Sequence, residues 1–256
     1  MPDFIIIGAQ RCGTTSLYNY LIQHPWIAPA SNKEVHFFDY NFGKGLAWYR
    51  AHFPSFLHKY YSRRVQGQDT ITGESSPYYL FHPHVPNRIL ETAPQVKLIV
   101  ILRNPVDRAY SHYHHERRLG FEALSFEEAI RREEERLEGE LERMIRDEKY
   151  HSFNHQHYSY LSRGIYVDQI RAWMNLFPKN QILILKSEDF HNDPRTVYNE
   201  TVKFFGLPAW QLGNFKEFNV GDYPKMPAAM RKHLSSYFNS HNKRLYEYLG
   251  RDFGWN

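Results

Sequence analysis

Two glycines, one arginine and three hydroxyl side chains lie close together between Phe4 and Ser16, directly after a short apolar run. Glycines let the backbone curl so that successive N–H groups face one anion, and the start of a following helix adds partial positive charge. Arg11 can reach over a bound group, while Thr14, Thr15 and Ser16 can donate hydroxyl hydrogens to it. This segment therefore predicts a phosphate-binding loop rather than a loop that only turns the chain.

The position of the cation separates this loop from the ATP-binding kind. A loop of the form GxxxxGK[ST] carries lysine directly after its second glycine. Here Thr14 follows Gly13, and the cation comes earlier, at Arg11. A triphosphate with Mg²⁺ needs that lysine and an acidic metal ligand, whereas a phosphosulfate carries less charge and can be held without a metal. The departure argues against a nucleotide kinase or another P-loop phosphotransferase, which is kept as the alternative.

A second short motif follows another apolar run, at residues 103–113. Asn104 is a favoured capping residue and Pro105 is favoured in the first turn of a helix, so a helix is expected to begin here. Arg103 then lies at the carboxyl end of the preceding strand, and Ser111 lies about two turns into the helix. An arginine and a serine in these places can hold a phosphate at two points.

Four short apolar runs are expected to form the strands that position these motifs. Helix-like segments follow at Thr14–Gln23, Pro105–Leu119 and Pro194–Phe205. This order predicts an α/β fold with a central, mostly parallel sheet flanked by helices. Ligands in such folds bind beyond the carboxyl ends of the strands. The apolar runs are Phe4–Ile7, a weaker Thr70–Gly73, Val96–Leu102 and Gln181–Leu185.

Composition limits the classes of function. The net charge of +4 suits an anionic ligand but is too small and too dispersed to indicate nucleic acid. Cys12 is the only cysteine, so no intrachain disulfide can form, which favours a reducing compartment. No apolar run approaches the ~20 residues of a membrane span, and the first residues lack the pattern of a secretory signal. We therefore expect a cytoplasmic protein without stable membrane insertion; the oligomeric state stays open.

The two motifs together resemble those of the PAPS-dependent sulfotransferases, which transfer a sulfuryl group from 3′-phosphoadenosine-5′-phosphosulfate (PAPS). Residues 4–16 are similar to their 5′-phosphosulfate loop, and residues 103–113 to their 3′-phosphate motif. Further segments look like the heparan sulfate 3-O- and N-sulfotransferases and their bacterial relatives: Lys33–Asp39, Lys44–Tyr49 and Asn242–Trp255. The resemblance runs from Phe4 to Trp255 and implies an enzyme that needs no metal and releases 3′-phosphoadenosine-5′-phosphate (PAP).

The resemblance implies a role for each matching residue. Arg11 becomes the counterpart of the loop lysine that contacts the transferring sulfonate. Glu34 falls on the catalytic base, with His36 and Asp39 on acceptor-side positions. Contacts with the donor are implied for Cys12, Gly13, Thr14, Thr15 and Ser16 in the loop, and for Arg103 and Ser111 in the second motif.

Several departures from the family pattern weaken the inference that this chain uses the family's polysaccharide acceptor. Arg11 replaces lysine, and Ser75 stands where those enzymes usually carry a second active-site lysine, so Ser75 and the nearby Tyr78 become acceptor-side candidates. The late disulfide loop of the animal 3-O enzymes is absent. The acceptor is therefore left open, between a carbohydrate hydroxyl or amine and a hydroxyl on a lipid or a carrier-bound acyl chain.

Two segments look instead like those of bacterial relatives. Asn219–Met226 resembles their cofactor-covering loop, which makes Tyr223 and Lys225 candidate donor contacts. Arg163 and Tyr166, in an Arg-Gly-Ile-Tyr segment, look like a further cofactor contact.

The base for the acceptor proton is expected in the segment Lys33–Phe38. If this segment is extended, Glu34 and His36 point to the same side, because side chains alternate along a strand. A carboxylate and an imidazole would then share one patch that faces the sulfonate. Glu34 is preferred as the base; His36 is the alternative, or orients the acceptor.

The chain length of 256 residues suits one domain over residues 1–256. Ser125 and Glu128 have the spacing of a capping box, and a charge-rich helix is expected to follow. This helix is interpreted either as a solvated surface helix or as a helical flap, inserted at about 121–160, beside the acceptor cleft.

Two hypotheses compete with an active transferase or add to it. One is a catalytically inactive module that only binds PAP on this fold. The other is a metal site in the histidine-rich segments at residues 112–115 and 155–157. The metal site is disfavoured because cysteine partners are missing and neither segment has a catalytic spacing such as HExxH.

Overall fold

The structure is a computed structural model, and it describes residues 1–55, 64, 67, 70–215 and 223–255. The chain folds into two compact units. The sheet unit comprises residues 1–101 and 174–219, and the helical unit comprises residues 102–173 and 220–256. The expectation of one domain with a helical insertion stays a prediction.

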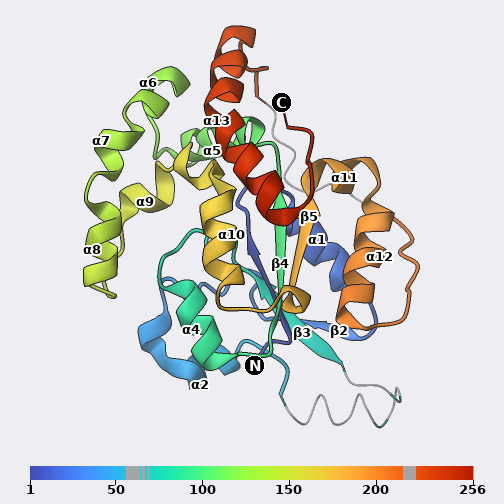
Figure 1. Ribbon diagram of the computed structural model, residues 1–256. Coiled ribbons are helices and arrows are strands. Elements are labelled where there is room, and N and C mark those ends of the chain that lie inside the picture. The colour runs from blue at the N-terminus through green and yellow to red at the C-terminus, as the bar shows by residue number, and fades with distance from the viewer. Residues whose placement is uncertain (56–63, 65–66, 68–69, 216–222, 256) are drawn as a thin grey trace. The chain divides into compact units, whose positions relative to one another are not determined.

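The sheet unit is built on a five-stranded sheet in the order β2-β3-β1-β4-β5 (Figure 1). The pairs β1–β3, β1–β4 and β2–β3 are parallel, with Phe4 opposite Gly73 and Lys97. The α/β class with a parallel sheet flanked by helices is thereby confirmed. The strands are β1 (Phe4–Gly8), β2 (Ile27–Pro29), β3 (Ile71–Ser75), β4 (Lys97–Leu102) and β5 (Ile182–Lys186).

The apolar runs became strands because both faces of the sheet are covered. The side chains of β1 and nearly all of those of β4 are fully buried, as expected for a central parallel strand. The expected strands agree with β1, β3, β4 and β5 to within two residues at each end. The short strand β2 was not predicted. It has three residues and ends at Pro29, a residue type that sheets tolerate at an edge.

Helices of the sheet unit connect these strands and cover them. Helices α1 and α12 contact each other, α1 also contacts β1 and β3, and α12 contacts β5 (Figure 1). The helical segments are α1 (Thr14–Leu21), η1 (Phe42–Lys44), α2 (Gly45–Arg50), α4 (Val85–Thr92), η3 (Lys179–Gln181), α11 (Ser187–Asn192) and α12 (Pro194–Phe205).

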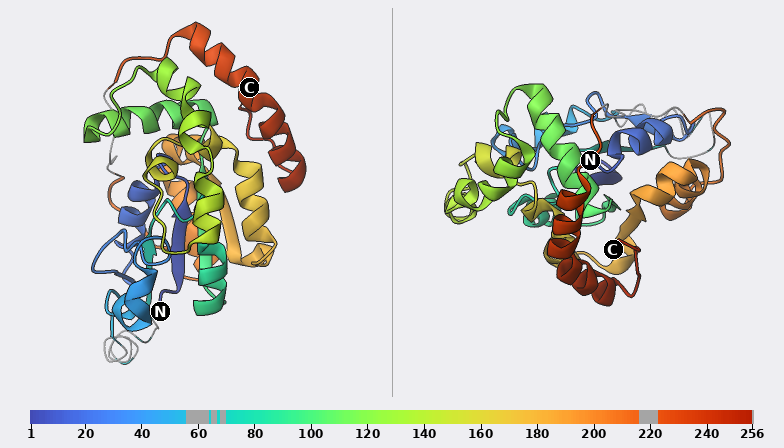
Figure 2. Two further views of the ribbon diagram at one scale, coloured as in Figure 1. Left: turned by 90° about the vertical axis from the view of Figure 1, so that its left-hand side faces the viewer. Right: turned by 90° about the horizontal axis from the view of Figure 1, so that it is seen from above.

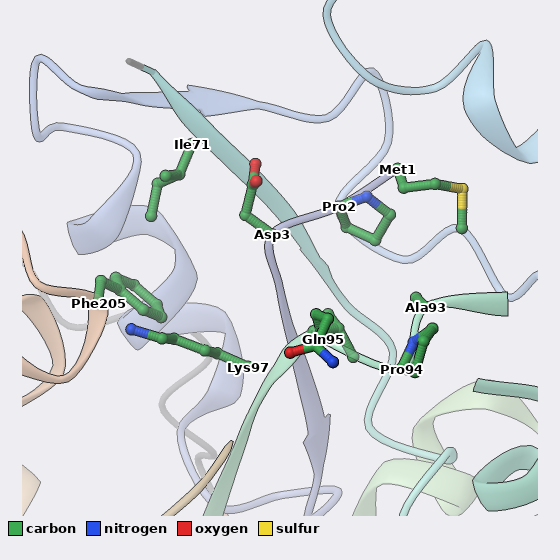
Figure 3. A pocket seen from close by; sticks show the side chains of 10 residues that line it. Met1, Pro2, Asp3, Ile71, Ala93, Pro94, Gln95, Lys97 and Phe205 are labelled. Carbon is green, nitrogen blue, oxygen red and sulfur yellow. The ribbon is translucent and has the colours of Figure 1, made fainter. Parts of the chain in front are cut away.

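The two ends of the parallel strands differ in what they carry. The carboxyl end of β1 leads into the glycine loop before α1, and the carboxyl end of β3 is followed by Ser76. At the amino ends, a cavity of about 380 Å³ lies among Met1, Asp3, Ile71, Lys97 and Phe205, and all its lining residues are drawn in Figure 3. The predicted chemistry belongs to the carboxyl ends, so this cavity is separate from it.

The helical unit packs around α5 and α13, which contact each other (Figure 2). Asn104 caps α5, since its side chain accepts a hydrogen bond from the Val106 amide, so the predicted helix start is confirmed. Tyr113, Phe126, Tyr160, Leu234 and Phe238 belong to the buried core of this unit. Its helices are α5 (Pro105–Leu119), α6 (Phe126–Arg131), α7 (Glu133–Leu137), α8 (Glu140–Arg146), α9 (Phe153–His157), η2 (Ser162–Gly164), α10 (Tyr166–Met174) and α13 (Ala228–Leu249).

The single charge-rich helix expected after Ser125 is wrong. The capping box of Ser125 and Glu128 is present, but the run is divided into the three short helices α6, α7 and α8. Glu133 is buried, and its carboxylate accepts the amides of Leu161 and Ser162, which fixes α7 from its first residue. Gly139 has φ of 71°, a conformation that ends one helix before α8 begins.

Among the described residues, no helix is both long enough and apolar enough to cross a membrane.

Candidate active site

The loop between β1 and α1 has the geometry expected of an anion site. Gly13 precedes α1 with φ of 99°, a left-handed conformation that glycine adopts without strain. A Cβ at this position would also meet the ring of Phe190 at 3.3 Å. The first amides of α1 lack partners within the helix, so they are available to an anion. Cys12 and Thr14 are buried, whereas Arg11, Thr15 and Ser16 are partly exposed.

Lys33 reaches this loop from the segment that follows β2. Its Nζ donates to Thr15 Oγ1 at 2.6 Å and lies 2.6 Å from Glu34 Oε1. The ammonium therefore lies between the first turn of α1 and the carboxylate that was predicted as the base. Lys33 belongs to one of the motifs that carry the family resemblance, but the sequence did not predict it as a site residue.

Glu34, His36 and Asp39, here called the Glu34 cluster, lie together; Glu34 and His36 meet, although the segment is not extended. His36 Nδ1 lies 2.7 Å from Asp39 Oδ2, and His36 Nε2 lies 3.2 Å from Glu34 Oε2. Residues 34–36 belong to no strand, and the φ of His36 is 51°. The condition for strand alternation, an extended segment, is therefore not met. The side chains meet because the left-handed turn at His36 places its ring between two carboxylates.

The charges of the Glu34 cluster fix its protonation. Burial alone would lower the pKa of His36, but hydrogen bonds to Asp39 and Glu34 raise it to about 10. Burial alone would raise the pKa of Glu34, but the hydrogen bond from His36 and the charge of Lys33 lower it to about 2. At neutral pH the cluster thus holds an imidazolium beside a charged carboxylate.

Backbone strain marks one residue of the glycine loop and one residue of the Glu34 cluster. Within the described parts of the chain, Arg11 and His36 are the two non-glycine residues with positive φ, at 69° and 51°. Side chains rarely adopt this region, and such positions persist only where the surroundings hold them; they gather at functional sites. Two segments predicted separately to act on the donor and on the acceptor share this feature.

A buried carboxylate that sequence reasoning missed holds the loop of His36 in place. Glu74, in β3, is fully buried and accepts hydrogen bonds from Tyr49, from Ser76 and from the Val35 amide. Burial raises the pKa of Glu74 to about 7. Ser76 Oγ in turn accepts the His36 amide at 3.2 Å. Glu74 and its partners therefore fix the backbone on which the Glu34 cluster stands.

The two predicted acceptor-side residues on β3 and beyond it are both buried. The Ser75 amide donates to the Lys33 carbonyl at 2.8 Å, which places Ser75 beside the same segment. Tyr78 lies near Tyr40, with ring centroids 5.7 Å apart, and it contacts His82 edge-on. The acceptor roles of Ser75 and Tyr78 stay predictions.

The residues predicted to hold the 3′-phosphate and the nucleotide lie in the helical unit. Arg103 directly follows β4, and its carbonyl accepts a hydrogen bond from Tyr166 Oη at 2.9 Å. Ser111 is buried within α5. Arg163 is also buried, and its Nη2 donates to the carbonyls of His155 and Gln156. The donor roles of these four predicted side chains stay predictions.

The covering loop predicted at Asn219–Met226 lies partly outside the described residues, which resume at Tyr223. The ring of Tyr223 stacks on His114, with centroids 4.5 Å apart and an angle of 4° between the planes. Lys225 is exposed. Their roles as donor contacts also stay predictions.

The histidine-rich segments form a second cluster of titratable groups, here called the Glu116 cluster: His112, Glu116 and His157. His112 Nε2 lies 3.1 Å from Glu116 Oε1, and His157 Nδ1 lies 2.8 Å from Glu116 Oε2. Across the described part of the chain, no group of three or more His, Cys, Asp or Glu side chains is arranged to hold a metal ion. The observed contacts make Glu116 a link between α5 and α9.

Comparison with known proteins supplies independent evidence. The family model described as "Sulfotransferase domain" matches residues 1–246. A sulfotransferase from Alicyclobacillus acidocaldarius, known from a crystal structure, is 30% identical, with a TM-score of 0.73 over 99% of this chain and 97% of that one.

Two curated relatives match nearly the whole chain. The membrane-associated sulfotransferase kil1 of Dictyostelium discoideum is 29% identical over 100% of this chain. Human heparan sulfate glucosamine 3-O-sulfotransferase 6 is 28% identical over 99%. The chain spans 66% of the length of the first relative and 73% of the second.

Proposed function

Because the chain belongs to the sulfotransferase domain family, and is thus a sulfotransferase, we propose that it transfers the sulfuryl group of PAPS with Glu34 as general base. The observation that carries the proposal is the Glu34 cluster beside Lys33 and the glycine loop, all within the sheet unit. The loop would hold the 5′-phosphosulfate, and the carboxylate would face the acceptor.

The chemical step is an in-line displacement at sulfur. The acceptor oxygen or nitrogen forms a bond to sulfur, while the bond between sulfur and the 5′-phosphate oxygen of PAPS breaks. The acceptor proton goes to Glu34, and PAP leaves with the electron pair of the broken bond. We expect a loose transition state like that of phosphoryl transfer, so positioning and charge stabilisation supply most of the catalysis.

His36 acts as the partner of the base rather than as the base. An imidazolium has no lone pair to accept a proton, and the contacts with Glu34 and Asp39 keep His36 protonated. Its Nε2 hydrogen instead orients the Glu34 carboxylate. Of the two bases that the sequence left open, this supports Glu34.

The donor is held by charge and by backbone amides. Arg11 stabilises negative charge on the sulfonate and on the leaving phosphate oxygen, since it belongs to the loop that precedes α1. The amides at the start of α1 and the hydroxyls of Thr15 and Ser16 contact the same group. Arg103 and Ser111 contact the 3′-phosphate, as their motif indicates.

The acceptor is proposed to be a carbohydrate that presents a hydroxyl or an amine. Human and nematode relatives named for heparan sulfate sulfotransfer match 99% and 98% of this chain, which supports a sugar acceptor. A hydroxyl on a lipid or a carrier-bound acyl chain is the alternative that an acceptor panel must include.

The proposed function is tested by donor binding and by transfer. Titration calorimetry should show PAP binding that does not depend on Mg²⁺ and is tighter than binding of ATP with Mg²⁺. With ³⁵S-labelled PAPS, label should then pass to heparosan oligosaccharides, which carry no sulfate, and not to a hydroxylated fatty acyl chain. Tighter, Mg²⁺-dependent ATP binding would instead favour a kinase, and PAP binding without transfer to any acceptor would favour an inactive module.

A further inference from the structure

Lys33 joins the two halves of the proposed reaction. Its ammonium lies 2.6 Å from Thr15 Oγ1, in the first turn of α1, and 2.6 Å from Glu34 Oε1. The transferring sulfonate must lie between the group held by the loop and the acceptor atom that faces the base. The Lys33 ammonium borders that space, since it contacts Thr15 on the side of the loop and Glu34 on the side of the proposed base.

The neighbouring segments hold Lys33 there. Its carbonyl accepts the amide of Ser75 at the end of β3, so the Lys33 backbone is joined to the sheet. Two residues further on, the Val35 amide donates to the buried Glu74 carboxylate. The Lys33 side chain is 23% exposed, so the cation is partly withdrawn from water. Electrostatic stabilisation is stronger at such a site than in bulk water.

On the premise of the proposed function, we propose that Lys33 is a catalytic residue that donates a hydrogen bond to a sulfonate oxygen of PAPS. An ammonium has three hydrogens to donate. One goes to Thr15 and one to Glu34, and the third is directed to the sulfonate. Ser75, next to the Lys33 carbonyl, is neutral and buried. The positive charge that stabilises the sulfonate therefore comes from Lys33 and not from position 75.

The contact strengthens as the reaction proceeds. Negative charge spreads over the sulfonate oxygens and the leaving phosphate oxygen in a loose transition state, so a fixed cation stabilises that state more than the bound donor. Lys33 also keeps Glu34 charged, because its ammonium lies against the carboxylate that must accept the acceptor proton. Its loss should therefore lower turnover and leave the binding of PAP, which has no sulfonate, nearly unchanged.

The test compares Lys33→Met, Lys33→Arg and the control Lys203→Met, a change at an exposed lysine of α12. Turnover of ³⁵S-labelled PAPS is measured with heparosan oligosaccharides. The affinity for PAP is measured by calorimetry, and stability by thermal melting. For Lys33→Met we expect kcat to fall about 100-fold or more, the effect of removing one transition-state donor. Its Kd for PAP should stay within about twofold of the wild-type value, and Lys33→Arg should recover most of the loss.

Other outcomes are distinguishable. A wild-type protein that neither binds PAP nor turns over PAPS overturns the proposed function itself. An active wild type whose Lys33→Met variant keeps its kcat overturns only the role of Lys33. A parallel loss of kcat, PAP affinity and melting temperature in both Lys33 variants also overturns it, because that pattern indicates a structural role.

Discussion

The Glu34 cluster and the Glu116 cluster combine the same two kinds of side chain, carboxylates and imidazoles, in opposite ratios. In the Glu34 cluster one imidazole lies between two carboxylates, Glu34 and Asp39. In the Glu116 cluster one carboxylate lies between two imidazoles, His112 and His157. The first stands on an irregular loop with Glu34 39% exposed, whereas the second joins α5 to α9 with Glu116 1% exposed.

The ratio and the burial together decide what each cluster can do. Two carboxylates raise the pKa of His36 to about 10, so its ring is a cation at neutral pH. Burial holds the pKa of His112 well below its usual range even though Glu116 lies beside it, so its ring is neutral. Residue types alone therefore do not separate the cluster proposed to be reactive from the one that links two helices. Solvent access and the number of carboxylates per imidazole do.

Glu34→Gln should produce the largest change, and it should affect catalysis alone. Glutamine keeps the shape of the side chain but cannot accept the acceptor proton, so kcat for sulfuryl transfer should fall about 10²–10⁴-fold. The matched control is Glu116→Gln, whose kcat per folded molecule should stay within about threefold of wild type. Turnover is measured with ³⁵S-labelled PAPS. Near-normal turnover by Glu34→Gln would move the base elsewhere and remove the contrast between the clusters.

Glu116→Ala should produce the converse effect, on stability. Its carboxylate is buried, and contacts from His112 and His157 lower its pKa to about 2 although burial alone would raise it. Removing the carboxylate leaves the two rings without the acceptor of their hydrogen bonds, and a buried polar group without a partner costs about 1–3 kcal/mol of unfolding free energy. Urea unfolding followed by circular dichroism measures this loss. If Glu34→Ala proved as destabilising as Glu116→Ala, the two clusters would not differ in kind.

The sequence alone was enough to predict features that depend only on residues close together along the chain. The cap at Asn104 and Pro105 and the box of Ser125 and Glu128 are local, and both are present. The apolar run Phe4–Ile7 predicted a buried strand because its burial follows from its own residues.

Features fixed by distant contacts could not be predicted. Glu74 meets Tyr49 across 25 residues, and the break before α7 depends on Glu133 meeting Leu161 across 28. The left-handed turn at His36 depends in part on Ser76. No local pattern encodes these partners.

The most direct test of the central claim is the pH dependence of single-turnover sulfuryl transfer to a hydroxyl acceptor between pH 7 and 9. With pKa values of about 2 for Glu34 and about 10 for His36, both groups keep their charges throughout this range. If Glu34 is the base, the transfer rate constant should stay constant within about twofold. A rate constant that rises about tenfold per pH unit would contradict the claim, because His36 would then have to lose its proton to act as the base.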